Sequence, residues 1–331
     1  MKRITLSLIA SFITLTACNQ QINQNLESKG ITYAEISVKE GGKWIDGSRG
    51  HKEYEGGKFK NVQQLSLDPN HTDHSFDIRY EGPGWENQNV GFRLYLDWRN
   101  AIDIFGKTVK SQILQEVGQD GFDSYHNMQP WGQDILKAGK SIGVGGFGRL
   151  INDTVSHFHK VADTSVKVKN EKNESNVLIH YKKWETLNHT TDLDAKISIY
   201  PYDRFSKFEL KTSHPTQGLT TGIVKFDHIP LKQNKSNDGK WGYIATYGNQ
   251  TLVNDSDLLG MAIFYKTDEV EKVTTAKHDH LIVFKPTTTP VTYYMLSAWG
   301  QEPNGITNES DFYKDLNNKL TQLQKNNRLN K

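Results

Sequence analysis

Hydrophobic and polar residues alternate along most of the chain, as they do in half-buried β-strands. Glycine-containing turns such as Gly41-Gly42 and Gly82-Pro83-Gly84 separate the alternating runs. The predicted strands cover residues 32–39, 75–80, 90–98, 177–184, 193–202, 207–211, 219–226, 241–247, 259–265, 280–284 and 291–298. Because helices do not alternate with these strands, we expect an all-β fold, a large antiparallel β-sandwich of the supersandwich kind.

Three segments have patterns that allow a helix. Residues 103–117 are ambiguous, and residues 133–138 could form a short helix after Pro130. In the tail, apolar residues recur at helical spacings of four, four and three: Phe312, Leu316, Leu320 and Leu323. We therefore predict a C-terminal helix, capped by Asn308 or Ser310 and docked on the sheet, with no functional role.

The N-terminal segment has the features of a secretory signal. Lys2 and Arg3 precede a short apolar run, which ends at Leu15-Thr16-Ala17-Cys18. This ending resembles the lipobox of bacterial lipoproteins, in which the cysteine is lipidated. We expect residues 1–18 to be a lipoprotein signal peptide, residues 19–30 a tether, and residues 31–331 a single β-sandwich catalytic domain. Because no acidic cluster follows Cys18, we expect a lipid anchor at the periplasmic face of the outer membrane.

Charge narrows the range of partners. Removal of residues 1–18 lowers the 40 lysines and arginines to 38, equal to the 38 acidic residues. Nucleic-acid binding is not expected, because a phosphate binder normally carries a basic stripe. Cys18 is the only cysteine, so no disulfide can form within the chain.

Residues 90–98 have two distinct faces. Phe92, Leu94 and Leu96 point one way, whereas Arg93, Tyr95, Asp97 and then Arg99 point the other way. Charged side chains are costly to bury without partners, so this polar face is either solvated or the wall of a cleft. Nearby candidates are Arg79, on the polar face of its own strand, and Trp85 and Glu86, which follow a turn.

The stretch from Ser124 to Leu150 combines Tyr125, His126 and lysines with many glycines. Histidine titrates near neutral pH, and a tyrosine can transfer a proton when its pKa is tuned. The alternative is a hydrogen-bonded structural pair. Lys137 and Lys140 could hold an anionic substrate, although most lysines are simply solvated.

Other chemistries have weaker support. Residues 143–148 match G-x-G-x-x-G, but a helix candidate precedes them and strand-like sequence follows, which argues against a dinucleotide site. His157 with His159, or His278 with His280, could chelate zinc with a third ligand. Neither G-x-S-x-G nor H-E-x-x-H occurs. We assign no metal and no other cofactor, and leave zinc or calcium open.

Several blocks, taken in order, resemble a bacterial lipoprotein family of formerly unknown function that occurs in polysaccharide-utilisation loci. They are residues 85–87, 90–107, 124–148, 219–222, 247–250 and 298–303. One family member is an ulvan oligosaccharide dehydratase. The resemblance implies removal of water from a non-reducing-end glucuronate or iduronate linked to sulfated rhamnose, which leaves a 4,5-unsaturated uronyl end. It implies no catalytic residues, so the roles that follow are our own.

Removal of water across C4–C5 of a uronate needs a cation on the carboxylate, a base for the C5 proton and an acid for the C4 hydroxyl. We assign Arg93 or Arg99 to the carboxylate, because a guanidinium binds it through two hydrogen bonds. His126 is the predicted base and Tyr125 the predicted acid, and these two roles could be exchanged. The predicted substrate-binding residues contact the sulfate (Lys137 or Arg79), stack on a sugar (Trp85 or Trp131) or belong to the polar loop (Glu86).

Two other functions fit the same residues. A polysaccharide lyase would use the same elimination with a glycosidic oxygen as leaving group. A non-catalytic glycan-binding lipoprotein would need the aromatic and charged residues but no proton-transfer pair. The expected partner is in each case an anionic sulfated oligosaccharide, and the sequence does not reveal the oligomeric state.

Overall fold

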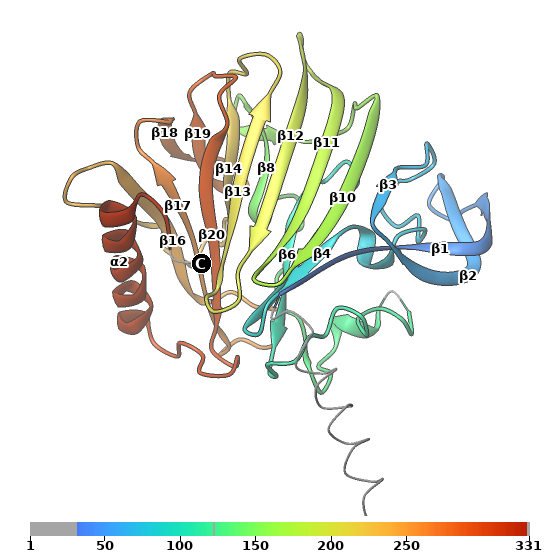
Figure 1. Cartoon of the computed structure of the whole chain (residues 1–331), viewed down its shortest axis with the longest axis horizontal. Coiled ribbons are helices and arrows are strands. Elements are labelled where there is room, and N and C mark those ends of the chain that lie inside the picture. The colour runs from blue at the N-terminus through green and yellow to red at the C-terminus, as the bar shows by residue number, and fades with distance from the viewer. Residues whose placement is uncertain (1–31, 122, 330–331) are drawn as a thin grey trace, which may run out of the picture.

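The computed structural model describes residues 32–121 and 123–329, which form three antiparallel sheets and one long helix (Figure 1). The predicted signal peptide, Cys18 and the tether lie outside these residues. Within the described part of the chain, no helix combines the length and apolar character of a membrane span. The prediction of an all-β sandwich is confirmed.

The largest sheet has nine strands. Its order is β15 (Lys232–Lys235), β16 (Trp241–Asn249), β17 (Leu258–Lys266), β20 (Val291–Trp299), β13 (Phe205–Thr212), β12 (His189–Ile199), β11 (Glu174–Thr186), β10 (Asp163–Glu171) and β3 (Gln64–Ser66). Alternate residues of its strands point to opposite faces, so one sheet serves two separate layers of packing.

Two smaller sheets complete the sandwich. The six-stranded sheet has the order β2 (Lys52–Val62), β1 (Tyr33–Asp46), β4 (Gly84–Glu86), β5 (Val90–Leu94), β6 (Ile102–Lys107) and β7 (Gly132–Asp134). The five-stranded sheet has the order β18 (Val270–Thr275), β19 (Asp279–Phe284), β14 (Leu219–Val224), β8 (Val144–Ile151) and β9 (Thr154–Ser156). Two short 3-10 helices, η1 (Arg79–Glu81) and η2 (Ser124–His126), lie in the connections.

The main core lies between the nine-stranded sheet and the two smaller sheets. Trp85 illustrates the packing: its ring stacks on Phe92 at 5.7 Å between centroids and meets Phe208 of the large sheet at 6.4 Å. Its indole nitrogen donates a hydrogen bond to Ser206 at 2.9 Å. Trp85 therefore joins two sheets through both dispersion contacts and a satisfied polar group.

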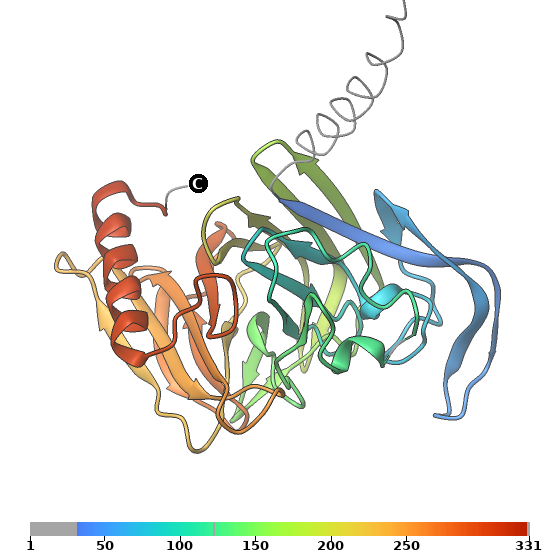
Figure 2. The same ribbon diagram turned by 90° about the horizontal axis from the view of Figure 1, so that it is seen from below.

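The predicted C-terminal helix is confirmed as α2 (Glu309–Asn326). Asn308 caps it by accepting a hydrogen bond from the Asp311 amide at 2.9 Å. Its four predicted apolar residues pack with Tyr243 and Phe264 on the face of β16 and β17 that points away from the main core. The helix stands at one end of the molecule, and the β1–β2 hairpin projects at the other (Figures 1 and 2).

Two local predictions were wrong, the short helix at residues 133–138 and the strand at residues 75–80, and the ambiguous segment of residues 103–117 is not a helix. Residues 103–117 begin in strand β6 and continue as turns, and residues 132–134 form strand β7, which pairs with residues 105–107. Residues 75–80, predicted as a strand, form turns and η1 instead, because Phe76 and Tyr80 have left-handed backbone angles (φ 60° and 39°). No alternation of side chains reveals such angles in advance.

Candidate functional site

Arg93 is the centre of a buried polar cluster. Its side chain is 1% exposed, although the strand that carries it, β5, looked from its sequence as if it could present a solvated face. One terminal nitrogen, Nη1, donates to the Tyr125 hydroxyl at 3.0 Å. The other, Nη2, donates to the Tyr95 hydroxyl at 2.9 Å, to Asp103 at 3.1 Å and to Asp134 at 2.5 Å. The polar face is thus neither solvated nor an open wall, and its charges are paired internally.

The cluster brings two buried carboxylates to one guanidinium. Asp103 lies on β6 directly opposite Arg93 in the strand register, and Asp134 comes from β7. Burial raises the pKa of both carboxyl groups, although Arg93 opposes this shift. The Oδ1 atom of Asp103 and the Nε atom of Arg93 are buried without a hydrogen-bond partner. Unsatisfied buried polar atoms of this kind are rare in folded proteins, so each one calls for an explanation.

Tyr125 and His126 lie on η2 at the edge of this cluster, with their ring centroids 4.6 Å apart. Tyr125 is buried, and burial raises the pKa of its hydroxyl above the ordinary value. His126 is half-buried, and its Nδ1 lies 3.5 Å from the Asp134 carboxylate. Burial, with the nearby positive charge of Arg93, lowers the pKa of His126. At neutral pH the pair therefore consists of a protonated phenol and a neutral imidazole.

Two further charged residues, Glu81 and Arg99, connect the cluster to the surface. Glu81 accepts from Arg99 Nη2 at 2.6 Å and lies 3.9 Å from Arg93 Nη1. Arg99 also bonds Asp97, and its guanidinium stacks over the Tyr95 ring at 3.9 Å. Its side chain is 14% exposed, so Arg99 is accessible where Arg93 is not. Among residues 32–121 and 123–329, no hydrogen-bond acceptor engages the Nη1 atom of Arg99.

The backbone around Glu81 is strained. His74, Phe76, Tyr80 and Glu81 all have positive φ angles, between 39° and 67°. His74 Nδ1 contacts Asp73 at 2.7 Å and Glu81 at 3.7 Å. Left-handed angles at non-glycine residues cost free energy and persist where the surrounding structure holds them, often at functional sites. Here they fix Glu81 between the two arginines.

Two hollows adjoin Tyr125. The first, of about 660 Å³, lies between the β1–β2 hairpin and the loop of residues 118–121, and its lining includes Lys39, Lys58, Phe59 and Phe76. The second, of about 510 Å³, is lined by Trp131 and by several polar side chains, among them Gln112, Gln119 and Gln129. Volumes of this size suit one or two sugar rings. Figure 2 shows the green segment between β6 and β7 beside the hairpin.

Three of the predicted substrate-binding residues are buried structural residues. Trp85 belongs to the core described above, so it cannot stack on a sugar. Glu86 forms a buried ion pair with Lys107 at 2.7 Å and accepts from the amide of Ile113. Arg79 donates to the carbonyl groups of residues 114, 115 and 117 and pairs with Glu35, so it has no exposed donor for a sulfate.

Two other predicted substrate-binding residues, Trp131 and Lys137, are accessible to a ligand. Trp131 is half-buried in the second hollow, and Lys137 is exposed three residues beyond Asp134. The histidine pairs are not brought together as metal sites: His157 bonds the Arg99 carbonyl at 2.6 Å, and His280 bonds Thr275. Within the described part of the chain, no group of three potential metal-ligating side chains was found.

The glycine-rich motif is part of strand β8, not a phosphate loop. Gly143 (φ 69°) packs against the backbone of Ile102, and Gly145 (φ 72°) lies against the Met295 side chain, so a Cβ atom at either position would clash. These glycines allow β8 to approach its neighbours closely.

Sequence reasoning missed Glu81, Asp103, Lys39 and Lys58. Asp103 carries a detectable signal, because it is a charge inside the otherwise apolar run Ile102–Phe105. Such a charge requires a buried partner. Glu81 and the hairpin lysines carry no such signal, because their positions depend on turns and on strand pairing between distant segments.

The chain belongs to the family described as Domain of unknown function (DUF4861), whose model matches residues 12–328. A search of curated proteins found no match. Among solved structures, the chain is similar to a TPR-domain containing protein from Parabacteroides distasonis, with 8% identity and a TM-score of 0.37. The match covers 84% of this chain and 56% of that one, so this chain spans just over half the length of that protein.

Proposed function

We propose that the protein is an oligosaccharide dehydratase, a carbon–oxygen lyase that acts on ulvan oligosaccharides. It removes water from the glucuronate or iduronate at the non-reducing end and leaves a 4,5-unsaturated uronyl end. The observation that carries the proposal is the pairing of a neutral, half-buried imidazole with a protonated, buried phenol, 4.6 Å apart and held by Arg93 and Asp134. The family resemblance supplies the substrate class.

His126 acts as the base in this proposal. Its lowered pKa keeps it unprotonated at neutral pH, and its half-exposed position lets it reach a bound sugar. The base removes the C5 proton, and the electron pair of that C–H bond forms the C4–C5 double bond. The negative charges of Asp123, Asp103 and Glu81, which favour the protonated ring, then stabilise the positive charge on the imidazole.

Tyr125 acts as the acid. As the C4–O bond breaks, the phenol donates its proton to the departing hydroxide, which leaves as water. Its raised pKa keeps the phenol protonated until that step, and hydroxide, with a conjugate-acid pKa of about 15.7, is a stronger base than the phenolate. Arg93 donates to the same oxygen and stabilises the phenolate until a proton returns from His126 through solvent.

Of the two arginines assigned to the substrate carboxylate, Arg99 and not Arg93 binds it in this proposal. Arg93 is enclosed by two carboxylates and two phenols, whereas Arg99 reaches the surface and keeps Nη1 outside its ion pairs. Neutralising the carboxylate lets negative charge from C5 spread into it during the elimination. Trp131, in the second hollow, stacks on a sugar ring, and Lys39 and Lys58, in the first hollow, are cations for the rhamnose sulfate. Lys137, which is exposed but lines neither hollow, is a further candidate cation.

We also propose that the protein is a lipoprotein held by Cys18 at the periplasmic face of the outer membrane. The lipobox-like sequence supports this location. Expression of the full chain in a Gram-negative host with labelled palmitate should give a labelled, membrane-bound product. Cys18→Ser should abolish the label, and a labelled Cys18→Ser product would contradict the assignment.

The test of activity uses ulvan oligosaccharides that are saturated at the non-reducing end, incubated with residues 19–331, with and without zinc or calcium. The expected result is a rise in ultraviolet absorbance near 235 nm and the loss of one water in the mass spectrum, without shorter fragments. Shorter unsaturated fragments would indicate a polysaccharide lyase instead. Binding without any rise in absorbance would indicate a non-catalytic glycan-binding protein.

A further inference from the structure

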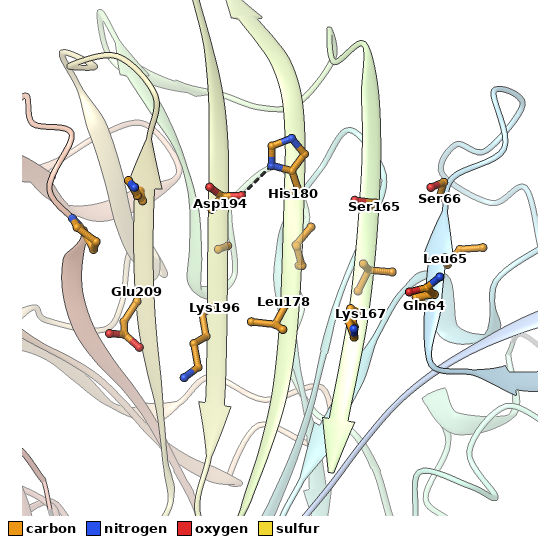
Figure 3. A pocket seen from close by; sticks show the side chains of 15 residues that line it. Gln64, Leu65, Ser66, Ser165, Lys167, Leu178, His180, Asp194, Lys196 and Glu209 are labelled. Atoms are coloured by element: carbon orange, nitrogen blue, oxygen red, sulfur yellow. Dashed lines mark hydrogen bonds and ion pairs between the residues drawn. The ribbon is translucent and has the colours of Figure 1, made fainter. Parts of the chain in front are cut away.

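The exposed face of the nine-stranded sheet carries a groove far from the Arg93 cluster. It has a volume of about 880 Å³ and is lined by side chains of β3, β10, β11, β12 and β13 (Figure 3). On the same face of the sheet, α2 covers the apolar surface of β16 and β17, whereas these five strands remain open. The groove is therefore the uncovered part of a face whose other part is core.

Strand register places the lining side chains in two rows across the sheet. One row is Ser66, Ser165, His180, Asp194 and Lys211, and the other is Gln64, Lys167, Leu178, Lys196 and Glu209. Each member of a row is the direct cross-strand partner of the next, and Figure 3 shows the rows side by side. With neighbouring strands about 4.8 Å apart, five strands give rows about 19 Å long. The groove thus suits an extended chain that crosses the strands.

The rows contain more hydrogen-bond donors than acceptors. Lys167, Lys196 and Lys211 face only two carboxylates, and both carboxylates are already engaged: Asp194 with His180 at 2.7 Å and Glu209 with Lys207 at 2.9 Å. Gln64, Ser66 and Ser165 add neutral donors. Within the described residues, the ion pair of Lys196 is a long contact of 3.9 Å to Glu174. A ligand rich in acceptor oxygens and negative charge complements this surface.

An apolar patch lies in the middle of the charged row. Leu178 is partly exposed between Lys167 and Lys196 (Figure 3). A ligand that presents both charged groups and carbon-bound hydrogens fits this sequence of side chains better than a small inorganic anion does. Sulfated and carboxylated sugars have this mixed character.

We propose that this groove is a non-catalytic binding site for an extended anionic polysaccharide chain. The ligand class follows from the groove's own side chains and does not rest on the proposed dehydratase activity. The core of the sandwich separates the groove from the Arg93 cluster, which belongs to the six-stranded sheet and the loops that follow it. The protein can therefore hold a polymer chain on one face while another chain end occupies the cluster.

The test measures binding of a sulfated dextran oligosaccharide and of its unsulfated counterpart to residues 19–331 by calorimetry. The groove variant is Lys167→Ala with Lys211→Ala. The matched control is Lys169→Ala with Lys182→Ala, which removes two exposed lysines from β10 and β11 outside the groove. A third variant, Leu178→Glu, places a negative charge in the middle of the row. The melting temperature of each variant is measured to confirm folding.

We expect the sulfated ligand to bind, and the groove variant and Leu178→Glu each to weaken binding at least 10-fold. The control variant should change affinity less than 2-fold, and the unsulfated ligand should bind at least 10-fold more weakly. Equal losses in the groove and control variants would overturn the proposal, because binding would then reflect surface charge in general. Absence of binding to the unsubstituted protein would overturn it as well. His126→Ala should bind normally, which separates this site from the failure or success of the dehydratase.

Discussion

Arg93 Nη1 donates a hydrogen bond to the Tyr125 hydroxyl at 3.0 Å, and Nη2 of the same guanidinium bonds Asp134 at 2.5 Å. One buried side chain therefore positions both the predicted acid and the carboxylate behind the predicted base. Arg93 does not reach the surface, so in the proposed mechanism it positions these groups and does not contact the substrate.

Replacing Arg93 should separate its electrostatic and geometric roles. Arg93→Met leaves Asp103 and Asp134 buried without a counter-charge, which should lower the free energy of unfolding by about 3–5 kcal/mol. Arg93→Lys keeps the charge but cannot bond Tyr125 and both carboxylates at once, so kcat should fall at least 10-fold with little change in KM. Chemical denaturation and steady-state kinetics test this. A large rise in KM in the lysine variant would instead indicate direct substrate contact.

His126→Ala should reduce turnover at least ~100-fold, because it removes the base. The melting temperature should stay unchanged, since the imidazole is half-buried and at the edge of the cluster. His228→Ala is the matched control: this exposed histidine bonds the Asn249 carbonyl, contacts the Phe226 ring and lies on a different loop. Near-normal turnover of the His126 variant would remove this residue from the mechanism.

The pH profile distinguishes the two assignments of acid and base. If His126 is the base, kcat/KM should rise with pH through a midpoint below 6.5, because the pKa of His126 is lowered and only the neutral ring accepts a proton. Activity should then stay level above neutral pH, since the pKa of Tyr125 is raised above 10. If the roles were exchanged, activity would instead fall as His126 lost its proton. Tyr125→Phe should lower the plateau without moving the acid limb.

Arg99→Ala should lower kcat/KM at least 10-fold on a uronate substrate. The same substrate with its carboxylate methyl-esterified offers no charge to Arg99, so the variant and the unsubstituted protein should differ less than 2-fold on the ester. This comparison isolates the interaction between the guanidinium and the carboxylate. A variant that loses equal activity on acid and ester would show that Arg99 acts through Glu81 and Tyr95 rather than on the substrate.

Asp279 should make stability depend on pH. This buried carboxylate accepts from the Ile142 amide at 3.0 Å, and burial raises its pKa to about 7. Between about pH 4 and pH 7 the folded state keeps a proton that the unfolded state has lost, so this group lowers the free energy of unfolding as pH rises. Asp279→Asn keeps the acceptor and removes the charge. In this variant the free energy of unfolding should fall between pH 5 and pH 8 by at least about 1 kcal/mol less than in the unsubstituted protein, as measured by denaturant unfolding. An equal fall in both proteins would show that Asp279 does not cause the pH dependence.

The sequence predicted the features that depend on local periodicity. Alternation predicted the β-sandwich, and the spacing of Phe312, Leu316 and Leu320 predicted α2. It did not predict β7, because the three residues Gly132–Asp134 are too few to show a period and are strands only through pairing with β6.

The candidate site was predicted in part. Tyr125, His126 and Arg93 do lie together, as predicted. They could be selected from the sequence because each is a polar residue in a conspicuous context. Trp85 and Arg79 were equally conspicuous, yet they are structural. Their chemical type does not distinguish a ligand-binding side chain from one that joins two sheets, since both kinds need hydrogen-bond partners. Only the partners themselves, Ser206 for Trp85 and Glu35 for Arg79, decide between the two roles.

The order of strands in the nine-stranded sheet constrains when the protein can fold. Strand β20 lies between β13 and β17, so the centre of the sheet is filled by residues 291–299. Until those residues are available, β13 is paired only with β12 and β17 only with β16, so each presents one open edge that can join other chains. A chain still emerging from a ribosome therefore cannot complete its largest sheet. Folding of this protein is a late, chain-wide event, and truncation before residue 291 should yield aggregates rather than a smaller sandwich.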